Sequence, residues 1–232
     1  MKLPAPLYKA EIIERKNRFV LICHCCKTRS RRRIYLADTG RLPDIIVPGR
    51  RILYHPSDDR SRSTAGTAVL ARLGKELVSI NSHRANQVAE LAIEKGGFPL
   101  LENWKLEQSE FSWHNSRFDF LLSRGEKKLM MEVKSVTLVR EGVACFPDAV
   151  TERGKKHVEE LIDWQRGERK RSLMLFLLGR GDGEKFRVCR EIDPDFARAV
   201  EKAMNEGVMV RALKSSVSIS SIKPGPEIPV IE

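Results

Sequence analysis

The sequence lacks the long apolar run that a membrane-spanning helix requires. Its longest wholly apolar stretch, residues 173–178, has six residues, whereas a bilayer span needs about 20. The first seven residues contain two prolines and no apolar core, which is unlike a secretory signal. We therefore expect a cytoplasmic protein without a membrane partner.

Cysteines are also scarce, and their number is odd. The five cysteines therefore predict no disulfide framework: Cys23, Cys25, Cys26, Cys145 and Cys189. Three of them lie with a histidine in the run at 23–26, which resembles a set of zinc ligands. Neighbouring side chains of a strand point to opposite faces, however, and the sequence has no partner CxxC pair elsewhere. We expect buried thiols there and no zinc.

Acidic residues are few in the first third of the chain. Residues 1–80 hold 17 Lys and Arg but only 7 Asp and Glu, whereas residues 81–232 hold 25 and 24. Nearly all of the net charge of +11 therefore lies in the first third. Such asymmetry favours a polyanionic partner, and we expect nucleic acid. Nothing in the sequence chooses between DNA and RNA or determines the oligomeric state.

The first 82 residues predict a small β-barrel. Runs with strand character lie at 19–26, 33–37, 51–54, 67–72 and 77–80, with turn-forming residues between them. Five short strands of this kind are typical of OB-like barrels, which commonly bind oligonucleotides. Aromatic side chains are few here: we expect Phe19 in the core, with Tyr35 or Tyr54 as candidates for stacking on a base.

A basic cluster lies between the first two of these strands. Its members are candidates for phosphate contacts that position nucleic acid without reading its sequence, and two further arginines extend it: Lys27, Arg29, Arg31, Arg32 and Arg33, then Arg50 and Arg51. The alternative is a solvated hairpin loop. Clustering favours the phosphate-binding interpretation because it concentrates the positive field.

From residue 83 the pattern changes to that of a mixed α/β domain. A helix starts after Asn81 or Ser82 and stops at Gly96 and Gly97, and strands follow at 105–111, 117–122 and 129–136. A helix at 151–165 precedes a buried strand at 173–178, and a helix capped by Asp193 precedes a strand at 208–213. We expect domains at 1–82 and 83–232, with a surface strand and arm from residue 215.

A hairpin with two facing carboxylates is the most informative feature of this second domain. If Gly125 and Glu126 form a two-residue type II′ turn, Asp119 lies directly opposite Glu132. Directly opposed residues project to the same face, with Cβ atoms about 4.5–5.5 Å apart. Lys134 lies two residues beyond Glu132 and therefore shares this face.

Two facing carboxylates repel each other unless a divalent cation binds them or they share a proton. Oxygen ligands of this kind suit Mg²⁺ or Mn²⁺. Such an ion can activate water and stabilise a departing phosphate oxygen. Lys134 would then position the water or neutralise charge on the phosphate. The alternative is a surface hairpin with ordinary charges and a slipped register.

The sequence resembles a known family at this point. Asp followed by Glu-x-Lys on adjacent strands looks like the PD-(D/E)XK nuclease motif. The longer stretches at 116–120, 131–138 and 146–157 resemble the sugar fermentation stimulation protein (SfsA) family, and short matches at 18–19, 38–40 and 85–86 extend the similarity over most of the chain. The family usually has Cys-Pro-Asn-Thr-Gly where this chain has Leu-Ala-Asp-Thr-Gly at 36–40, so no role of that Cys or Asn is carried over.

The resemblance implies a DNA-binding protein with an N-terminal OB-like barrel and a PD-(D/E)XK-like α/β domain. It places Asp119, Glu132 and Lys134 at the nuclease triad, with Glu110 as a further acidic ligand. It also favours a role in holding phosphate for three residues of the next helix, which on charge alone resembles a solvated basic turn: Arg153, Lys156 and His157.

Two functional hypotheses remain from the sequence. One is a non-enzymatic DNA-binding protein with a vestigial nuclease fold, and the other is a metal-dependent nuclease acting on DNA or RNA. The intact triad favours the second, whereas the family resemblance supports binding and does not address cleavage, because a fold does not fix an activity.

Overall fold

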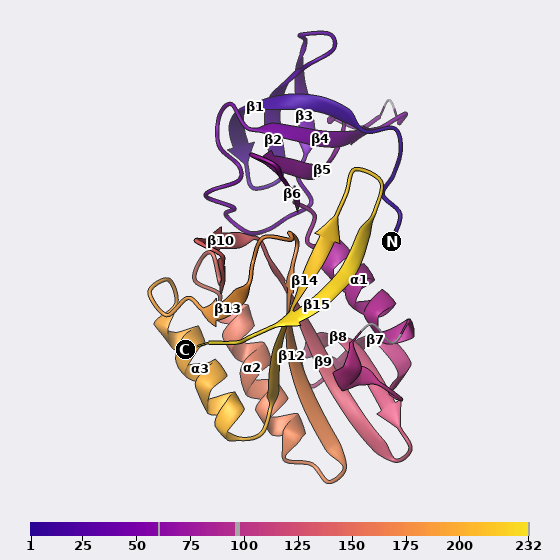
Figure 1. Cartoon of the computed structure of the whole chain (residues 1–232), viewed down its shortest axis with the longest axis vertical. Helices are drawn as coiled ribbons and strands as arrows, with labels where there is room; N and C mark the ends of the chain where they lie inside the picture. Colours follow the sequence, from indigo (N-terminus) through magenta and orange to yellow (C-terminus); the bar gives the residue numbers. More distant parts are fainter. Residues whose placement is uncertain (60, 96–97, 232) are drawn as a thin grey trace.

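The computed structural model describes residues 1–59, 61–95 and 98–231. Its first part is a six-stranded sheet rolled into a barrel, in the order β3-β2-β1-β4-β5-β6, seen at the top of Figure 1. The strands are β1 (Tyr8–Asn17), β2 (Val20–Cys25), β3 (Arg31–Tyr35), β4 (Arg51–Pro56), β5 (Gly66–Leu73) and β6 (Glu76–Ser79).

Five of these strands close into a ring, because β3 pairs with β5 through Tyr35 and Thr67. The predicted five-stranded barrel is confirmed, but its membership differs from the prediction. Strand β1 was not predicted, and β6, which was counted among the five, lies beside β5 and outside the ring. Only Ala10 and Ile12 of the ten β1 residues are buried, so the charged remainder hides the alternation that identifies a strand.

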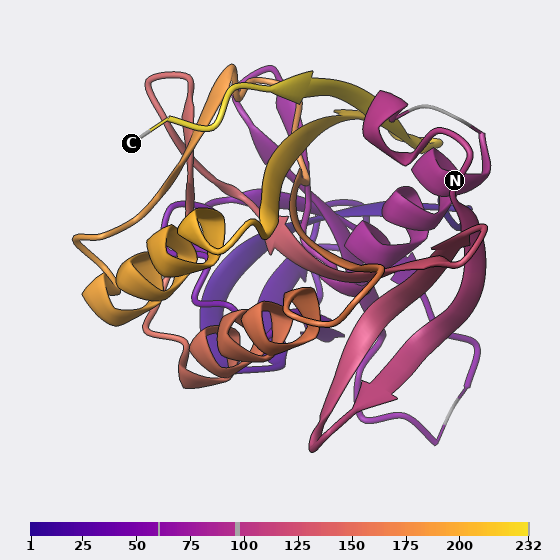
Figure 2. The same cartoon turned by 90° about the horizontal axis from the view of Figure 1, so that it is seen from below.

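The second part is a six-stranded mixed sheet in the order β15-β14-β12-β9-β8-β7, with helices on both faces (Figures 1 and 2). Its strands are β7 (Lys105–Trp113), β8 (Ser116–Arg124), β9 (Lys127–Val136), β12 (Lys170–Leu178), β14 (Met209–Val217) and β15 (Ile222–Ile228). The helices are α1 (His83–Glu94), a 3₁₀ turn η1 (Pro99–Leu101), α2 (Glu152–Gln165) and α3 (Pro194–Asn205).

The predicted α/β order is confirmed, and the helix starts follow from their caps. Thr151 accepts a hydrogen bond from the Gly154 N–H at 3.0 Å, and Asp193 accepts one from the Phe196 N–H at 2.9 Å. Helix α1 begins directly after Ser82, while the glycine pair at 96–97 that was expected to end it lies outside the described residues. Among the described helices, none has the length and apolarity needed to cross a membrane.

The central strands are buried on both faces, and this alternation sets the direction of the functional side chains. Met131 and Val133 of β9 pack with α1, whereas Met130 packs with α2 and α3. Successive side chains of a strand point to opposite faces, so Glu132 lies on the α2 side. Phe118 packs on the α2 side of the sheet, whereas Phe120 packs on the α1 side.

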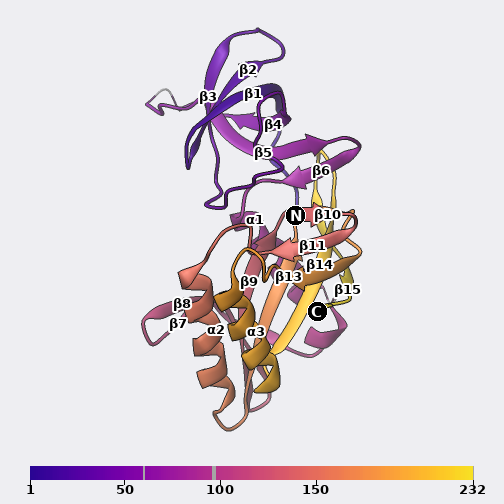
Figure 3. The ribbon, with the colours of Figure 1, turned by 90° about the vertical axis from the view of Figure 1, so that its left-hand side faces the viewer.

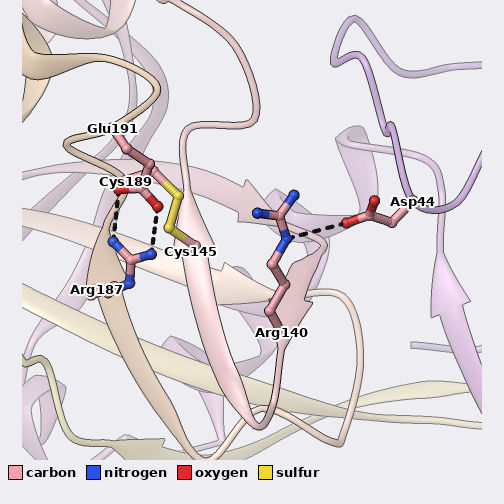
Figure 4. Close-up of a disulfide and its surroundings, with 6 residues drawn as sticks. All are labelled: Asp44, Arg140, Cys145, Arg187, Cys189 and Glu191. Carbon is pink, nitrogen blue, oxygen red and sulfur yellow. Dashed lines mark hydrogen bonds and ion pairs between the residues drawn. A yellow bond between two sulfur atoms is a disulfide. The ribbon is translucent and has the colours of Figure 1, made fainter.

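A small third sheet was not predicted and carries a disulfide. It has the order β10-β11-β13, with β10 (Leu138–Arg140), β11 (Val143–Phe146) and β13 (Lys185–Val188). Cys145 in β11 is bonded to Cys189, with Cα atoms 5.5 Å apart (Figure 4). The expectation of no disulfide framework did not foresee this single pair, because an odd total does not prevent two cysteines from meeting where β11 and β13 run side by side.

The barrel stands on the α/β domain through hydrogen bonds and a shared core (Figure 3). The Leu42 N–H donates to Asp148 Oδ2 at 2.8 Å, and the Ser79 N–H donates to the Gly179 carbonyl at 2.8 Å. Val69 and Leu70 of β5 belong to the same apolar core as α1. These contacts hold the barrel turn at 38–42 against the loop between β11 and α2.

Candidate metal and nucleic-acid site

The β8–β9 hairpin has the register predicted from its turn. Arg124 pairs with Lys127 and Phe120 pairs with Met131, so the next position along brings Asp119 beside Glu132. Gly125 has φ of +59°, which fits the first central position of a type II′ turn and is free of steric cost for glycine.

Glu132 is the centre of the polar network on this hairpin. Its Oε1 accepts a hydrogen bond from His157 Nδ1 at 2.6 Å and an ion pair from Lys134 Nζ at 2.7 Å. Burial opposes ionisation of this carboxyl, but the Lys134 ammonium and the His157 hydrogen bond outweigh it and lower the pKa of Glu132. Lys134 shares the face of Glu132, as predicted.

The other oxygen of Glu132 is unsatisfied. Glu132 is only 4% exposed, and its Oε2 has no hydrogen-bond partner within the described part of the chain. A buried carboxylate oxygen left without a partner loses its hydration at a cost of about 1–3 kcal/mol or more. This oxygen is therefore a free ligand atom beside Asp119.

Asp119 occupies the neighbouring position with both oxygens held by the protein. Oδ2 accepts the Val133 N–H at 2.7 Å, and Oδ1 accepts Asn86 Nδ2 at 2.5 Å from α1. Burial, and then the charge of Glu132, raise the pKa of Asp119 to about 6, although these hydrogen bonds partly offset the rise. A carboxylate has about four lone-pair sites, so both oxygens retain capacity for a cation.

These groups open into a cleft of about 710 Å³ that the two domains form together. The α/β domain contributes Asp119, Glu132 and Lys134, and the barrel contributes the turn at 38–42 together with Arg18. Most residues that line the cleft are charged or polar, which disfavours binding of an apolar ligand.

A second pair of carboxylates lies in the same cleft and was not singled out from the sequence. A Cβ added to Gly40 would lie 3.0 Å from oxygens of both Asp38 and Asp148, so glycine lets the two carboxylates approach closely. Burial raises the pKa of Asp38, and the charge of Asp148 adds to the rise. Asp148 also accepts the Leu42 N–H described above, so this pair joins the barrel to the α/β domain.

Glu110 does not join the cleft. It lies on the edge strand β7 with φ of +55°, and its side chain is 69% exposed in a 3.5 Å ion pair with Arg117. The predicted role as a metal ligand is therefore not supported: the irregular backbone at this position turns the carboxylate to solvent, beside Arg117.

The basic residues of the barrel are at the surface, as a phosphate-binding role requires. All are exposed except Arg50, which is half-buried: Lys27, Arg29, Arg31, Arg32, Arg33 and Arg51. The aromatic expectations need correction, because Phe19 is 40% exposed rather than in the core and Tyr54 is only 4% exposed. Tyr35 remains accessible.

The three basic residues predicted on α2 differ in burial. Arg153 and Lys156 are exposed, and Arg153 lines the cleft. His157 is only 2% exposed, and this burial disfavours the predicted direct contact with a phosphate. Its Nε2 accepts a hydrogen bond from Arg153 Nε at 3.4 Å while Nδ1 bonds Glu132. His157 therefore orients Glu132 and links it to Arg153.

Sequence reasoning missed three other residues of the cleft as site residues. Asn86, Asp38 and Asp148 all lie in stretches that carry the family resemblance, which was the available signal. Their distance along the chain from the hairpin concealed the fact that they share its cleft.

Comparisons with known proteins agree with this architecture. Residues 13–80 match the SfsA N-terminal OB domain, and residues 83–221 match the sugar fermentation stimulation protein RE domain. The sugar fermentation stimulation protein homolog of Shouchella clausii is 39% identical over 232 residues, covering 100% of both chains. The homolog of Syntrophotalea carbinolica is 36% identical over 219 residues, covering 94% of both chains.

A solved structure extends the agreement to three dimensions. The structure of Pyrococcus furiosus SfsA in complex with Ca²⁺ aligns with a TM-score of 0.88 at 27% identity, over 100% of this chain and 98% of that one. Both domains and nearly the full length are thus shared with these relatives. The chain belongs to the sugar fermentation stimulation protein family.

Proposed function

We propose that this protein binds DNA largely without regard to sequence, through the basic barrel, and brings a backbone phosphate to a divalent-cation site at Asp119 and Glu132. RNA has the same backbone phosphates and is the other nucleic acid that this surface suits. Mg²⁺ or Mn²⁺ is the expected ion. The Ca²⁺ complex of the relative from Pyrococcus furiosus supports a divalent cation in this family.

The observation that carries the proposal is the orphaned Oε2 of Glu132. A buried, ionised carboxylate normally has partners for both oxygens, and a cation beside Asp119 would satisfy this one. The same cation would oppose the burial and the charge of Glu132, which together raise the pKa of Asp119. The donor set therefore fits a hard divalent ion, which prefers carboxylate oxygens.

The neighbouring residues would act on the phosphate and on the ligands. Lys134 has three donors, one of which is used by Glu132, so another can reach a phosphate oxygen in the cleft. Arg153 lines the cleft as a second cationic donor, and His157 holds the orientation of Glu132. A divalent ion bound there would supply Lewis-acid stabilisation of charge on the phosphate.

The alternative function is hydrolysis of phosphodiester bonds by a Mg²⁺- or Mn²⁺-dependent nuclease. The observation that favours it is the convergence of Asp119, Glu132 and Lys134 on one open cleft, with Glu132 kept ionised by its neighbours. A half-buried ammonium beside the carboxylate pair would stabilise the negative charge that develops on the scissile phosphate during hydrolysis. Lys134 is 14% exposed at its side chain, so it is held close to the site.

Binding is tested by fluorescence anisotropy with labelled duplexes of unrelated sequence over a range of salt. We expect similar affinities for all of them and a steep fall in affinity with salt, because phosphate contacts release counterions. Affinity that is independent of salt would refute the electrostatic basis of the proposal.

Cleavage is tested by Mg²⁺- or Mn²⁺-dependent nicking of plasmid and single-stranded DNA, with Asp119→Asn and Lys134→Ala purified identically. Activity that is lost in both variants would establish the nuclease. Activity that persists unchanged in both would be contamination, and no activity on any substrate would leave the binding function alone.

A further inference from the structure

We propose that Phe19 and Tyr35 form a stacking platform for unpaired nucleobases beside the cation cleft, so that the preferred ligand is a duplex with a single-stranded extension. This inference rests on the proposed nucleic-acid binding and specifies its substrate class. It concerns the barrel surface, which the Asp119 and Glu132 site does not include.

The apolar ring of Phe19 is partly exposed to solvent, which is unfavourable. It is 40% exposed, although burying a phenylalanine side chain stabilises a fold by about 1.5–3 kcal/mol. Its ring stacks on Tyr35 with centroids 6.3 Å apart and planes inclined by 27°. The two rings therefore form one aromatic surface at the end of the β2–β3 pair, where a third ring can stack.

Hydrogen bonds fix the backbone that carries the platform. The Phe19 N–H donates to Asn17 Oδ1 at 2.9 Å, and the Phe19 carbonyl accepts the Leu36 N–H at 2.9 Å. Val20 and Tyr35 are paired in the barrel ladder. A fixed backbone limits the entropy that is lost when a base stacks on these rings, which favours binding.

The surroundings are those of a nucleic-acid site. Phe19 and Tyr35 line a hollow of about 420 Å³ together with Arg18 and Arg62. Two guanidinium groups next to an aromatic pair provide contacts for both parts of a nucleotide, the phosphate and the base. Ser63 and Thr64 complete the rim with hydroxyl groups.

Arg18 lines both the hollow and the cation cleft, so the two adjoin at this residue. On the other side, β3 leads away from it with three outward side chains. Arg31, Arg33 and Tyr35 alternate along the strand, while Ile34 between them is fully buried in the barrel. A strand leaving the cleft would thus meet Arg18, then the aromatic pair, then two arginines.

Unpaired bases suit this surface best. In the interior of a duplex, the faces of the bases are covered by their neighbours, whereas in a single strand they are free to stack on aromatic side chains. Each stacked base strengthens binding by roughly 5- to 150-fold. The platform would therefore select junctions between duplex and single strand over blunt duplex.

The test compares three kinds of fluorescein-labelled ligand by anisotropy in EDTA, where cleavage cannot interfere. They are a blunt duplex, the same duplex with a short thymidine extension at either the 3′ or the 5′ end, and the same extension made of abasic sugar-phosphates. The variant is Phe19→Ala, and the matched control is Tyr8→Ala, because Tyr8 is also exposed (46%) but packs against Tyr54 elsewhere on the barrel.

We expect wild type and Tyr8→Ala to bind one of the thymidine extensions at least 5-fold more tightly than blunt duplex, in line with one stacked base. The abasic extension and Phe19→Ala should both abolish this gain without changing affinity for blunt duplex. The abasic ligand tests stacking on the unmodified protein, so the result does not depend on how the variant folds.

Two results would overturn the inference alone. One is an abasic extension that binds as well as thymidine, since attraction would then be to phosphate. The other is blunt-duplex binding with the expected salt dependence and no gain from an extension. Failure of wild type to bind any of the ligands would instead refute the proposed function and the inference with it.

Discussion

Replacing Asp119 by asparagine should make the metal-free protein more stable above pH 6. Burial and the charge of Glu132 raise the pKa of Asp119 from 3.8 to about 6. A shift of about two pK units corresponds to about 3 kcal/mol. The unfolded chain therefore releases this proton more readily than the folded protein, so ionisation of Asp119 lowers the free energy of unfolding.

The sign of the pH dependence follows from proton binding. Between about pH 4 and pH 6 the folded state holds more protons at this site than the unfolded state, so stability falls as pH rises through that window. Above about pH 6 the full loss of stability from ionised Asp119 is present. Asparagine carries no charge and should escape the cost at every pH.

Asparagine can also keep the local hydrogen bonds. Its Oδ1 can accept the Val133 N–H, and its amide can donate to Asn86 if that side chain turns its oxygen toward it. We therefore expect metal-free Asp119→Asn to exceed wild type by up to about 3 kcal/mol at about pH 7.5, with the difference vanishing toward pH 4.

The assay is urea unfolding with EDTA, followed by the fluorescence of the three tryptophans, all of which lie in the α/β domain. Mn²⁺ at about 100 times its dissociation constant should add about 2.7 kcal/mol to wild type and nothing to Asp119→Asn. Asp163→Asn, which removes an exposed carboxylate from α2, is the matched control and should behave as wild type. Equal stabilisation of both proteins by Mn²⁺ would refute the cation site.

Three further predictions follow from the structure. Charge reversal of the arginines at 31–33 to Glu should weaken binding to all unrelated duplexes equally and reduce the slope of log K against log salt by about three units. The control is charge reversal of Lys185, Arg198 and Lys202, which are exposed on the other domain. Equal slopes for the two variants would contradict the barrel site. If the protein cleaves DNA, Lys134→Ala should lower the rate of cleavage by orders of magnitude while barely changing the affinity for DNA. Lys134→Arg should not restore cleavage, because a planar guanidinium does not replace a compact ammonium. A cleavage rate in Lys134→Ala equal to that of wild type would exclude a catalytic role for Lys134. Reduction of the Cys145–Cys189 bond, which joins positions 44 residues apart, should lower the free energy of unfolding by about 4 kcal/mol, measured by urea unfolding with and without dithiothreitol; a Cys189→Ala variant as stable as the oxidised wild type would contradict this.

Local features of the fold were accessible from the sequence because their causes are local. Gly125 sets the turn, the turn sets the register, and the register places Asp119 beside Glu132. Thr151 and Asp193 cap their helices with their own side chains. In each case the determining residue lies within a few positions of the feature that it determines.

Features that depend on long-range packing were not accessible in the same way. Strand β1 has only two buried residues, so its identity as a barrel strand comes from its neighbours β2 and β4. Asp38 and Asp148 are far apart in sequence and meet only because the barrel docks on the α/β domain. The burial of His157 and the exposure of Glu110 likewise follow from tertiary contacts, which residue type alone does not reveal.

The most direct test of the proposed function is duplex binding measured by anisotropy for wild type and Asp119→Asn, over a range of KCl, with Ca²⁺ or with EDTA. Both proteins should show a steep linear fall of log K with log salt, because the barrel arginines are unchanged. Ca²⁺ should tighten binding by wild type only, since the cation links the carboxylates to a backbone phosphate. A flat salt dependence, or an equal effect of Ca²⁺ on both proteins, would contradict the account.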